Sequence, residues 1–191
     1  MNLWLRLLWA LLSWRGRGQL SVWDVAKRPF RVWPTDLDTF NHMNNGKYGS
    51  LMDLGRLDLW LRSGTWQACK ERGWYPVIVA ETITFRKSLA PRQKFDIETR
   101  IAGWDAEAFY VDTRFTVNGE IYTQTWARLR FLQRPRGIVT PEQILAVVGR
   151  PVDDRQVPGW VLDWAAKTAL PKGKEPAPSI WKWPGSSPHL P

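Results

Sequence analysis

The chain has 191 residues and a formal net charge of +9. This length is enough for one domain with a sizeable core. The excess of positive charge predicts an anionic partner, either a phosphate-bearing ligand or an acidic lipid surface. Nucleic acid is disfavoured, because the Lys and Arg residues are scattered and no nucleic-acid-binding motif is present. The single cysteine, Cys69, excludes an internal disulfide and fits a cytoplasmic location; no Cys/His cluster predicts a metal site, and we expect no cofactor.

Residues 1–19 form a separate apolar segment at the start of the chain. Leu and Trp dominate it, and its charged residues are Arg6, Arg15 and Arg17. The run is too short for a helix that spans a bilayer, which needs about 20 residues. Leu and Trp beside Arg are typical of a helix in a membrane interface, which predicts peripheral membrane contact through residues 1–17. A terminal helix that covers the domain's own apolar surface is the equally weighted alternative.

The main domain, residues 20–149, begins with a predicted strand over residues 20–33, which Pro29 interrupts. A long helix is predicted over residues 48–61, and a second, short helix over residues 66–73.

The long predicted helix is apolar on most of its sides, which is typical of a helix buried in a core. Gly49 and Gly55 each lower helix propensity by about 1 kcal/mol relative to Ala, so we expect close packing to explain them.

Four alternating runs follow, and each predicts a strand: residues 77–87, 94–101, 109–117 and 121–131. Asn118-Gly119 joins the last two runs and indicates a hairpin, because both turn residues need positive φ. Thr140-Pro141-Glu142 opens a short amphipathic helix that ends at Val148. These elements predict an α+β domain in which a curved antiparallel sheet of about five strands, four of them a meander, wraps around one long helix. Residues 150–191 are rich in Pro, Gly and Lys and predict an irregular tail.

The polar residues suited to chemistry are concentrated between the first strand and the long helix. Two carboxylates, one histidine, several asparagines and a glycine occur there. Such a joint can hold a carboxylate beside a helix N-terminus, where free N–H groups and the macrodipole gather. A carboxylate and fixed N–H donors are the minimum equipment for attack on a carbonyl.

This joint resembles that of the hotdog-fold acyl-CoA thioesterases of the 4-hydroxybenzoyl-CoA type, which reads Asp-x-Asp-x-x-Gly-His-x-Asn-Asn-x-x-Tyr. Asn41 stands here in place of the family's glycine, and as asparagine tolerates left-handed backbone, the turn is expected to survive. The likeness covers residues 28–148 and is nearest to the branch of thioesterase superfamily member six. The residues that carry it are Asp36-Leu37-Asp38-Thr39-Phe40-Asn41-His42-Met43-Asn44-Asn45-Gly46-Lys47-Tyr48, Gly103-Trp104-Asp105 and Ala108-Phe109-Tyr110.

The resemblance implies a hotdog fold and hydrolysis of acyl-CoA. It also implies a homodimer or dimer of dimers, in which each active site takes residues from both chains. An exposed sheet edge independently predicts such pairing. The alternative function is a membrane-associated acyl-CoA-binding or scaffold protein with little or no turnover, for which the basic, Trp-rich ends of the chain argue.

The resemblance assigns the catalytic role to Asp38, as a nucleophile or as a general base for water. From the residues alone, an aspartate that caps a turn is the competing interpretation. Asn45 would donate its backbone N–H to the thioester oxygen. His42 would orient the thioester or the water, with a structural role as the alternative. Asp36 is expected to serve a turn or a salt bridge.

Substrate-binding roles are predicted for a second set of residues. Asn44 is expected to cap the helix and orient His42, while Tyr48 is either a substrate contact or a core residue. Coenzyme A carries phosphates, so cations on the later strands are candidates for binding it, with a solvated charged face as the alternative for each. These cations are Arg86, Lys87, Arg92, Arg128, Arg130 and Arg134.

Overall fold

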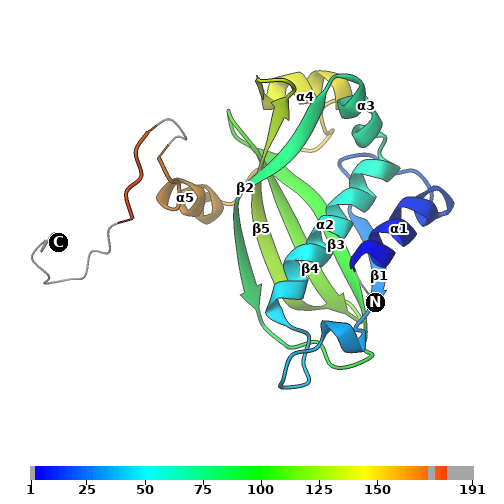
Figure 1. Cartoon of the computed structure of the whole chain (residues 1–191). Coiled ribbons are helices and arrows are strands. Elements are labelled where there is room, and N and C mark those ends of the chain that lie inside the picture. The colour runs from blue at the N-terminus through cyan, green and yellow to red at the C-terminus, as the bar shows by residue number, and fades with distance from the viewer. Residues whose placement is uncertain (1–2, 172–174, 180–191) are drawn as a thin grey trace, which may run out of the picture.

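The computed structural model describes residues 3–171 and 175–179 and shows the predicted hotdog architecture (Figure 1). A curved antiparallel sheet packs against the long helix α2 (Asn45–Arg62). The strands are β1 (Ala26–Arg31), β2 (Trp74–Phe85), β3 (Lys94–Trp104), β4 (Phe109–Val117), β5 (Glu120–Gln133) and the two-residue β6 (Ile138–Val139). The predicted irregular tail lies outside the described residues at positions 172–174 and 180–191.

The strand order is β1-β3-β4-β5-β2, with β6 paired to β5. The predicted meander is therefore correct for β3, β4 and β5 but wrong for β2, which pairs with β5 at the far edge. The reason is that β1 occupies the edge of β3, so β2 takes the free edge of β5. Alternation in a sequence identifies strands and their buried faces but does not specify their partners.

The hairpin between β4 and β5 is confirmed. Asn118 and Gly119 have positive φ angles of 50° and 82°, as a tight turn between twisted strands requires. Pro29 lies within β1, where a missing N–H is tolerated because β1 is an edge strand.

Helix α2 contacts the sheet most closely at Gly55. A Cβ at this position would lie 2.7 Å from Ile97 Cγ2 and 2.8 Å from Thr99 Oγ1 of β3. The expectation of close packing is thus confirmed for Gly55. At Gly49 a Cβ would meet nothing within 4 Å, so close packing does not explain that glycine.

Helix α1 (Leu3–Ser13) and the short helix η1 (Trp14–Arg17) precede the sheet, and α1 lies beside α2 (Figure 1). One face of α1 packs onto the domain, with Ala10 fully buried and Arg6 2% exposed. The opposite face exposes large apolar side chains, namely Trp4, Leu5, Leu8, Leu11 and Leu12. The packed face fits the interpretation of a helix that covers the domain. The membrane prediction depends on the exposed apolar face.

A buried ion cluster joins this N-terminal segment to the domain. The side chains of Arg28 and Asp58 are both 0% exposed and lie 2.6 Å apart. Asp58 also pairs with Arg17 and with Arg62, each at 3.3 Å. Burial lowers the pKa of Arg28, and the charge of Asp58 opposes that effect. The cluster links η1, β1 and α2 through one carboxylate.

The predicted irregular tail is wrong for residues 159–167, which form helix α5 (Gly159–Lys167) after helix α4 (Pro141–Val148). Val161 and Ala165 are buried against Tyr110 and Trp126. Val111 and Ala127, which follow Tyr110 and Trp126 in their strands, face the α2 side, so α5 covers the opposite face of the sheet. The high Pro and Gly content of the tail led to the wrong prediction. A helix this short is stabilised mainly by packing of its apolar face on the sheet, which local sequence does not show.

Candidate active site

The polar joint forms a narrow loop of residues 36–44, which we call the Asp38 loop. Its two sides are paired through the backbone. The amide of Asn44 donates to the carbonyl of Asp36 over 2.8 Å, and the amide of Asp38 donates to the carbonyl of His42 over 2.8 Å. Between them, Leu37 and Met43 form an isolated antiparallel bridge. The loop is thus ordered by its own backbone rather than by extended secondary structure.

The carboxylate of Asp38 closes the tip of this loop. Its Oδ1 accepts hydrogen bonds from the backbone amides of Phe40, over 2.9 Å, and His42, over 3.1 Å. These contacts match the turn-capping interpretation. Among the described residues none donates a hydrogen bond to Oδ2, so one oxygen orders the turn while the other is available to a substrate or a water molecule. The structural role and a chemical role are therefore compatible.

The substitution of asparagine for the family's glycine is accommodated by the backbone. Asn41 has a φ of 61°, in the left-handed region that asparagine tolerates better than most residues. The expected turn therefore survives. Phe40, beside it, is 80% exposed, and the His42 side chain is exposed as well, so the tip of the loop is open to solvent in the single chain.

The loop leads directly into the N-terminus of α2. Asn44 is the N-cap, as predicted, and its Oδ1 accepts from the Gly46 amide over 2.8 Å. The Lys47 amide donates to the Asn44 carbonyl over 2.9 Å. No described residue accepts a hydrogen bond from the Asn45 amide, so this donor faces outward at the positive end of the helix dipole. No hydrogen bond links Asn44 to the His42 side chain in the described region.

Two anchors hold the loop on the domain. Asp36 is 2% exposed and accepts from Arg6 over 2.5 Å and from the Trp33 amide over 2.8 Å. This confirms the expected turn and salt-bridge role, and it makes α1 a support of the loop. The Met43 amide donates to the carbonyl of Leu89, in the connection after β2, over 3.0 Å.

Tyr48 has a packing role in the single chain. It is 1% exposed, and its ring contacts those of Phe85 and Phe115 at centroid distances of 5.1 and 4.9 Å. Burial raises the pKa of its hydroxyl. A core role fits these contacts, whereas direct contact with a substrate does not.

The predicted coenzyme A cations do not form one group. Arg86 and Lys87 follow β2 and lie close in sequence to Leu89, and both pair with Glu120 at 2.8 Å. Their hydrogen bonds lower the pKa of Glu120. These two cations therefore belong to the same end of the sheet as the Asp38 loop.

Arg128 and Arg130 lie on the face of the sheet away from α2, because their strand neighbour Leu129 packs in the core on the α2 side. Both pair with Glu107, and Arg128 also lies 3.2 Å from Asp105. In one chain they are separated from the Asp38 loop by the sheet, so this part of the predicted binding set is not brought together with Asp38.

Sequence reasoning missed two hollows beside α2. One is a groove between α2 and β2, with a volume of about 240 Å³. Its walls include Leu54, Leu57, Ile78 and Leu129, and α1 contributes Leu7. The groove residues come from five elements, so no local motif could have revealed them. The signal available in the sequence was the unbroken apolar run from Trp74 to Ala80.

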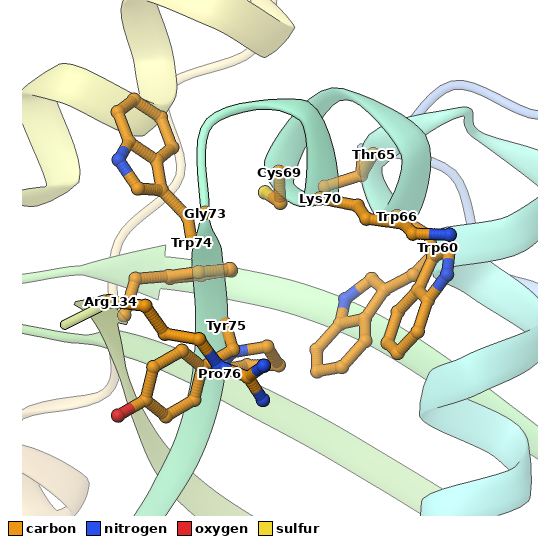
Figure 2. A pocket seen from close by; sticks show the side chains of 11 residues that line it. Trp60, Thr65, Trp66, Cys69, Lys70, Gly73, Trp74, Tyr75, Pro76 and Arg134 are labelled. Atoms are coloured by element: carbon orange, nitrogen blue, oxygen red, sulfur yellow. The ribbon is translucent and has the colours of Figure 1, made fainter.

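The other hollow, which we call the distal pocket, lies at the C-terminal end of α2 and has a volume of about 260 Å³ (Figure 2). Its walls are mainly aromatic and include Trp60, Trp66, Trp74, Tyr75 and Phe131. Cys69 also lines it, and burial raises the pKa of this thiol to about 11, which removes it as a nucleophile at neutral pH.

Within residues 3–171 and 175–179, no three His, Cys, Asp or Glu side chains gather as a metal site. None of the helices in the same ranges is long and apolar enough to cross a membrane.

Comparison with known proteins places the whole Asp38 loop inside a family match. A model of the thioesterase-like superfamily matches residues 32–148. Protein THEM6 of Xenopus laevis is 32% identical over 167 residues, which cover 86% of this chain and 80% of the relative.

Solved structures share the fold at low sequence identity. The YbaW Probable Thioesterase from Escherichia coli superimposes with a TM-score of 0.61 at 15% identity, over 64% of this chain and 96% of that one. The DHNA-CoA thioesterase from Staphylococcus aureus has a TM-score of 0.55 at 14% identity, over 75% of this chain and 90% of that one.

Proposed function

The chain belongs to the thioesterase-like superfamily, and on this premise we propose that it hydrolyses acyl-CoA thioesters to a free acid and coenzyme A. The observation that carries the proposal is the Asp38 loop. It holds a carboxylate with one free oxygen on the same short segment as a helix N-terminus with a free amide. The coenzyme A thioesterase among the structural neighbours supports this substrate class.

The reaction follows from these groups. Asp38 either attacks the thioester carbonyl itself or takes a proton from a water molecule that attacks. The carbonyl oxygen becomes an oxyanion, which the Asn45 amide and the helix dipole stabilise. Collapse of the adduct breaks the C–S bond and releases the thiolate of coenzyme A. This thiolate takes its proton from Asp38 if that residue acted as the base, or from water if it acted as the nucleophile. If Asp38 is the nucleophile, water then hydrolyses the resulting anhydride.

The groove between α2 and β2 is suited to the acyl chain. Leu54, Leu57 and Ile78 offer apolar surface there, and burying such surface yields about 25 cal/mol per Å². Arg86 and Lys87 are the cations that we assign to the coenzyme A phosphates, since they lie at the end of the sheet that holds the Asp38 loop.

We further propose that the active protein is a homodimer joined through β2. This strand is paired only with β5 within the described region, and it exposes Ile78, Val79 and Phe85. A long exposed apolar edge is usually paired in a native protein. Pairing of two β2 strands would also cover the exposed Asp38 loops. Light scattering at micromolar concentration should give twice the chain mass, and a monomer would contradict the proposal.

The exposed face of α1 supports peripheral membrane contact as part of the same function. Arg15, which is exposed, follows its apolar side chains, and a cation near an anionic surface adds about 1 kcal/mol. Arg17 does not contribute in this way, because it pairs with Asp58. Replacing the exposed Leu8 and Leu12 by serine should abolish sedimentation with anionic liposomes and leave soluble-substrate turnover intact. Serine at Leu7 and Ala10, on the packed face, should instead destabilise the domain. If the wild-type protein does not sediment with anionic liposomes, the membrane proposal is wrong.

Hydrolysis is tested first at Asp38. Asn at this position keeps the Oδ1 acceptor for the amides of Phe40 and His42 but removes the charge. Turnover should fall at least ~100-fold with an unchanged melting temperature. Unaltered thiol release from a panel of acyl-CoAs would remove Asp38 from the mechanism. Acyl-CoA binding by wild-type protein without thiol release would favour the binding or scaffold alternative.

The oxyanion role is tested at Asn45, where the backbone allows a matched pair of variants. Proline is favoured at the first helical position, and Asn44 has a ψ of 133°, which a following proline accepts. Asn45→Pro therefore removes the N–H and keeps the helix, while Asn45→Ala keeps both. We expect kcat to fall about 10²–10³-fold in the first variant only. Equal activity of the two would show that this amide does not stabilise the reaction.

A further inference from the structure

The distal pocket is separated from the Asp38 loop by the length of α2. Trp60 lies 15 positions after Asn45, which at 1.5 Å per residue places it about 22 Å farther along the helix. A small molecule bound in the pocket would not reach the Asp38 loop. The cavity of about 260 Å³ is near the lower end of the range for small-molecule sites, roughly 300 Å³.

The walls of the pocket are aromatic on both sides (Figure 2). Trp60 and Trp66 extend from the end of α2 and from α3 (Thr65–Glu71), whereas Trp74 and Tyr75 come from the first residues of β2. Phe131 of β5 is buried, and its ring lies 6.4 Å from that of Trp60. Such walls favour a short apolar chain, because its burial removes apolar surface from water.

The charges at the rim are of one sign. Lys70 and Arg134 are the charged residues that line the pocket, and no described carboxylate pairs with either of them. The guanidinium of Arg134 lies 5.4 Å from the centre of the Tyr75 ring, beside Pro76 (Figure 2). Elsewhere in the described region most arginines near the sheet have an acidic partner, as Arg86 and Arg128 do. Two such cations over an aromatic cavity favour a ligand with an apolar chain and an anionic group, such as a carboxylate.

From this arrangement we propose that the distal pocket is a binding site for a small amphiphilic carboxylate, that is, a short- to medium-chain fatty acid. The apolar chain lies among the tryptophans and the carboxylate meets Arg134 and Lys70. The pocket adjoins the groove assigned above to the acyl chain, because Trp60, Trp66 and Pro76 line both, so the proposal rests in part on the proposed function.

The test is calorimetry of the full chain with octanoate, kept below its micellar concentration. We expect saturable binding of octanoate, weaker binding of octan-1-ol and none of acetate. Arg134→Gln should weaken octanoate about tenfold and leave octan-1-ol unchanged, because it removes only the charged contact. Arg136→Gln is the matched control: it removes the same charge from the same loop but does not line the pocket, and it should have no effect.

Three results would overturn the proposal. Equal weakening by Arg134→Gln and Arg136→Gln would mean that octanoate responds to net charge only. Loss of octanoate binding in Asp38→Asn, or in Leu57→Ala, a variant of a residue that lines the groove but not the pocket, would place the ligand in the proposed catalytic site instead. Trp66→Ala, at a side chain that is 42% exposed, should weaken both octanoate and octan-1-ol with the assembly unchanged; if it dissociates the protein into smaller species, the pocket is an interface between chains.

Discussion

The N-terminal end of α2 carries polar groups on an exposed loop, whereas its C-terminal end carries an aromatic pocket beside a buried ion cluster. At the first end, order comes from backbone hydrogen bonds within the Asp38 loop and from the Asn44 cap. At the second end, it comes from side-chain burial around Asp58 and Phe131. The difference teaches that one helix can position reactive groups where packing is sparse because its other end is firmly held. The following variants test this comparison.

The largest effect is expected at Asp58, which is fully buried with Arg28. Asp58→Asn would leave Arg28 and its neighbours without a counter-charge, so the free energy of unfolding should fall by about 3–5 kcal/mol. Urea denaturation measures this change. Asp53→Asn is the control, since the side chain of Asp53 is 71% exposed and its pair with Arg56 should be worth under about 1 kcal/mol. Similar losses at both sites would show that the cluster is not the anchor.

A smaller effect is expected at the centre of the helix. Gly55→Ala would force a Cβ to within 2.7 Å of Ile97 Cγ2, and relieving this contact should cost about 1–3 kcal/mol of unfolding free energy. Gly49→Ala places a Cβ in open space and should stabilise the helix by about 0.5–1 kcal/mol. Thermal denaturation of the two variants should therefore shift in opposite directions. A shift in the same direction would mean that α2 can move away from β3.

The smallest effect on stability is expected at the cap. Asn44→Ala removes the acceptor of the Gly46 amide and should lower the free energy of unfolding by about 1 kcal/mol. Turnover should fall as well, because the cap fixes the position of the Asn45 amide. Asn44→Asp keeps an acceptor and should retain both stability and turnover. If Asn44→Ala leaves turnover unchanged, the helix start does not need its cap to present the amide.

Much of the Asp38 loop was predictable because its properties are local. Three of its features depend on residues within about four positions of each other: the Asn44 cap, the left-handed Asn41 and the turn-capping Asp38. The local sequence therefore determines them. The same holds for the Asn118-Gly119 hairpin. The alternation of β3 and β5 gave their buried faces for the same reason. β4 is instead buried on both faces, because α5 packs on the side away from α2.

The rest was decided by contacts between distant segments. Arg28 meets Asp58 from 30 positions away, β2 joins β5 instead of β3, and α5 forms only where Tyr110 and Trp126 offer it a surface. The distal pocket likewise assembles from four elements, α2, α3, β2 and β5, which no short sequence window contains. The sequence by itself determined the turns, the caps and the periodicity of each element, because short-range sterics and hydrogen bonds set them. Only the tertiary structure decided which faces meet, because burial depends on the whole chain and not on its order along one segment.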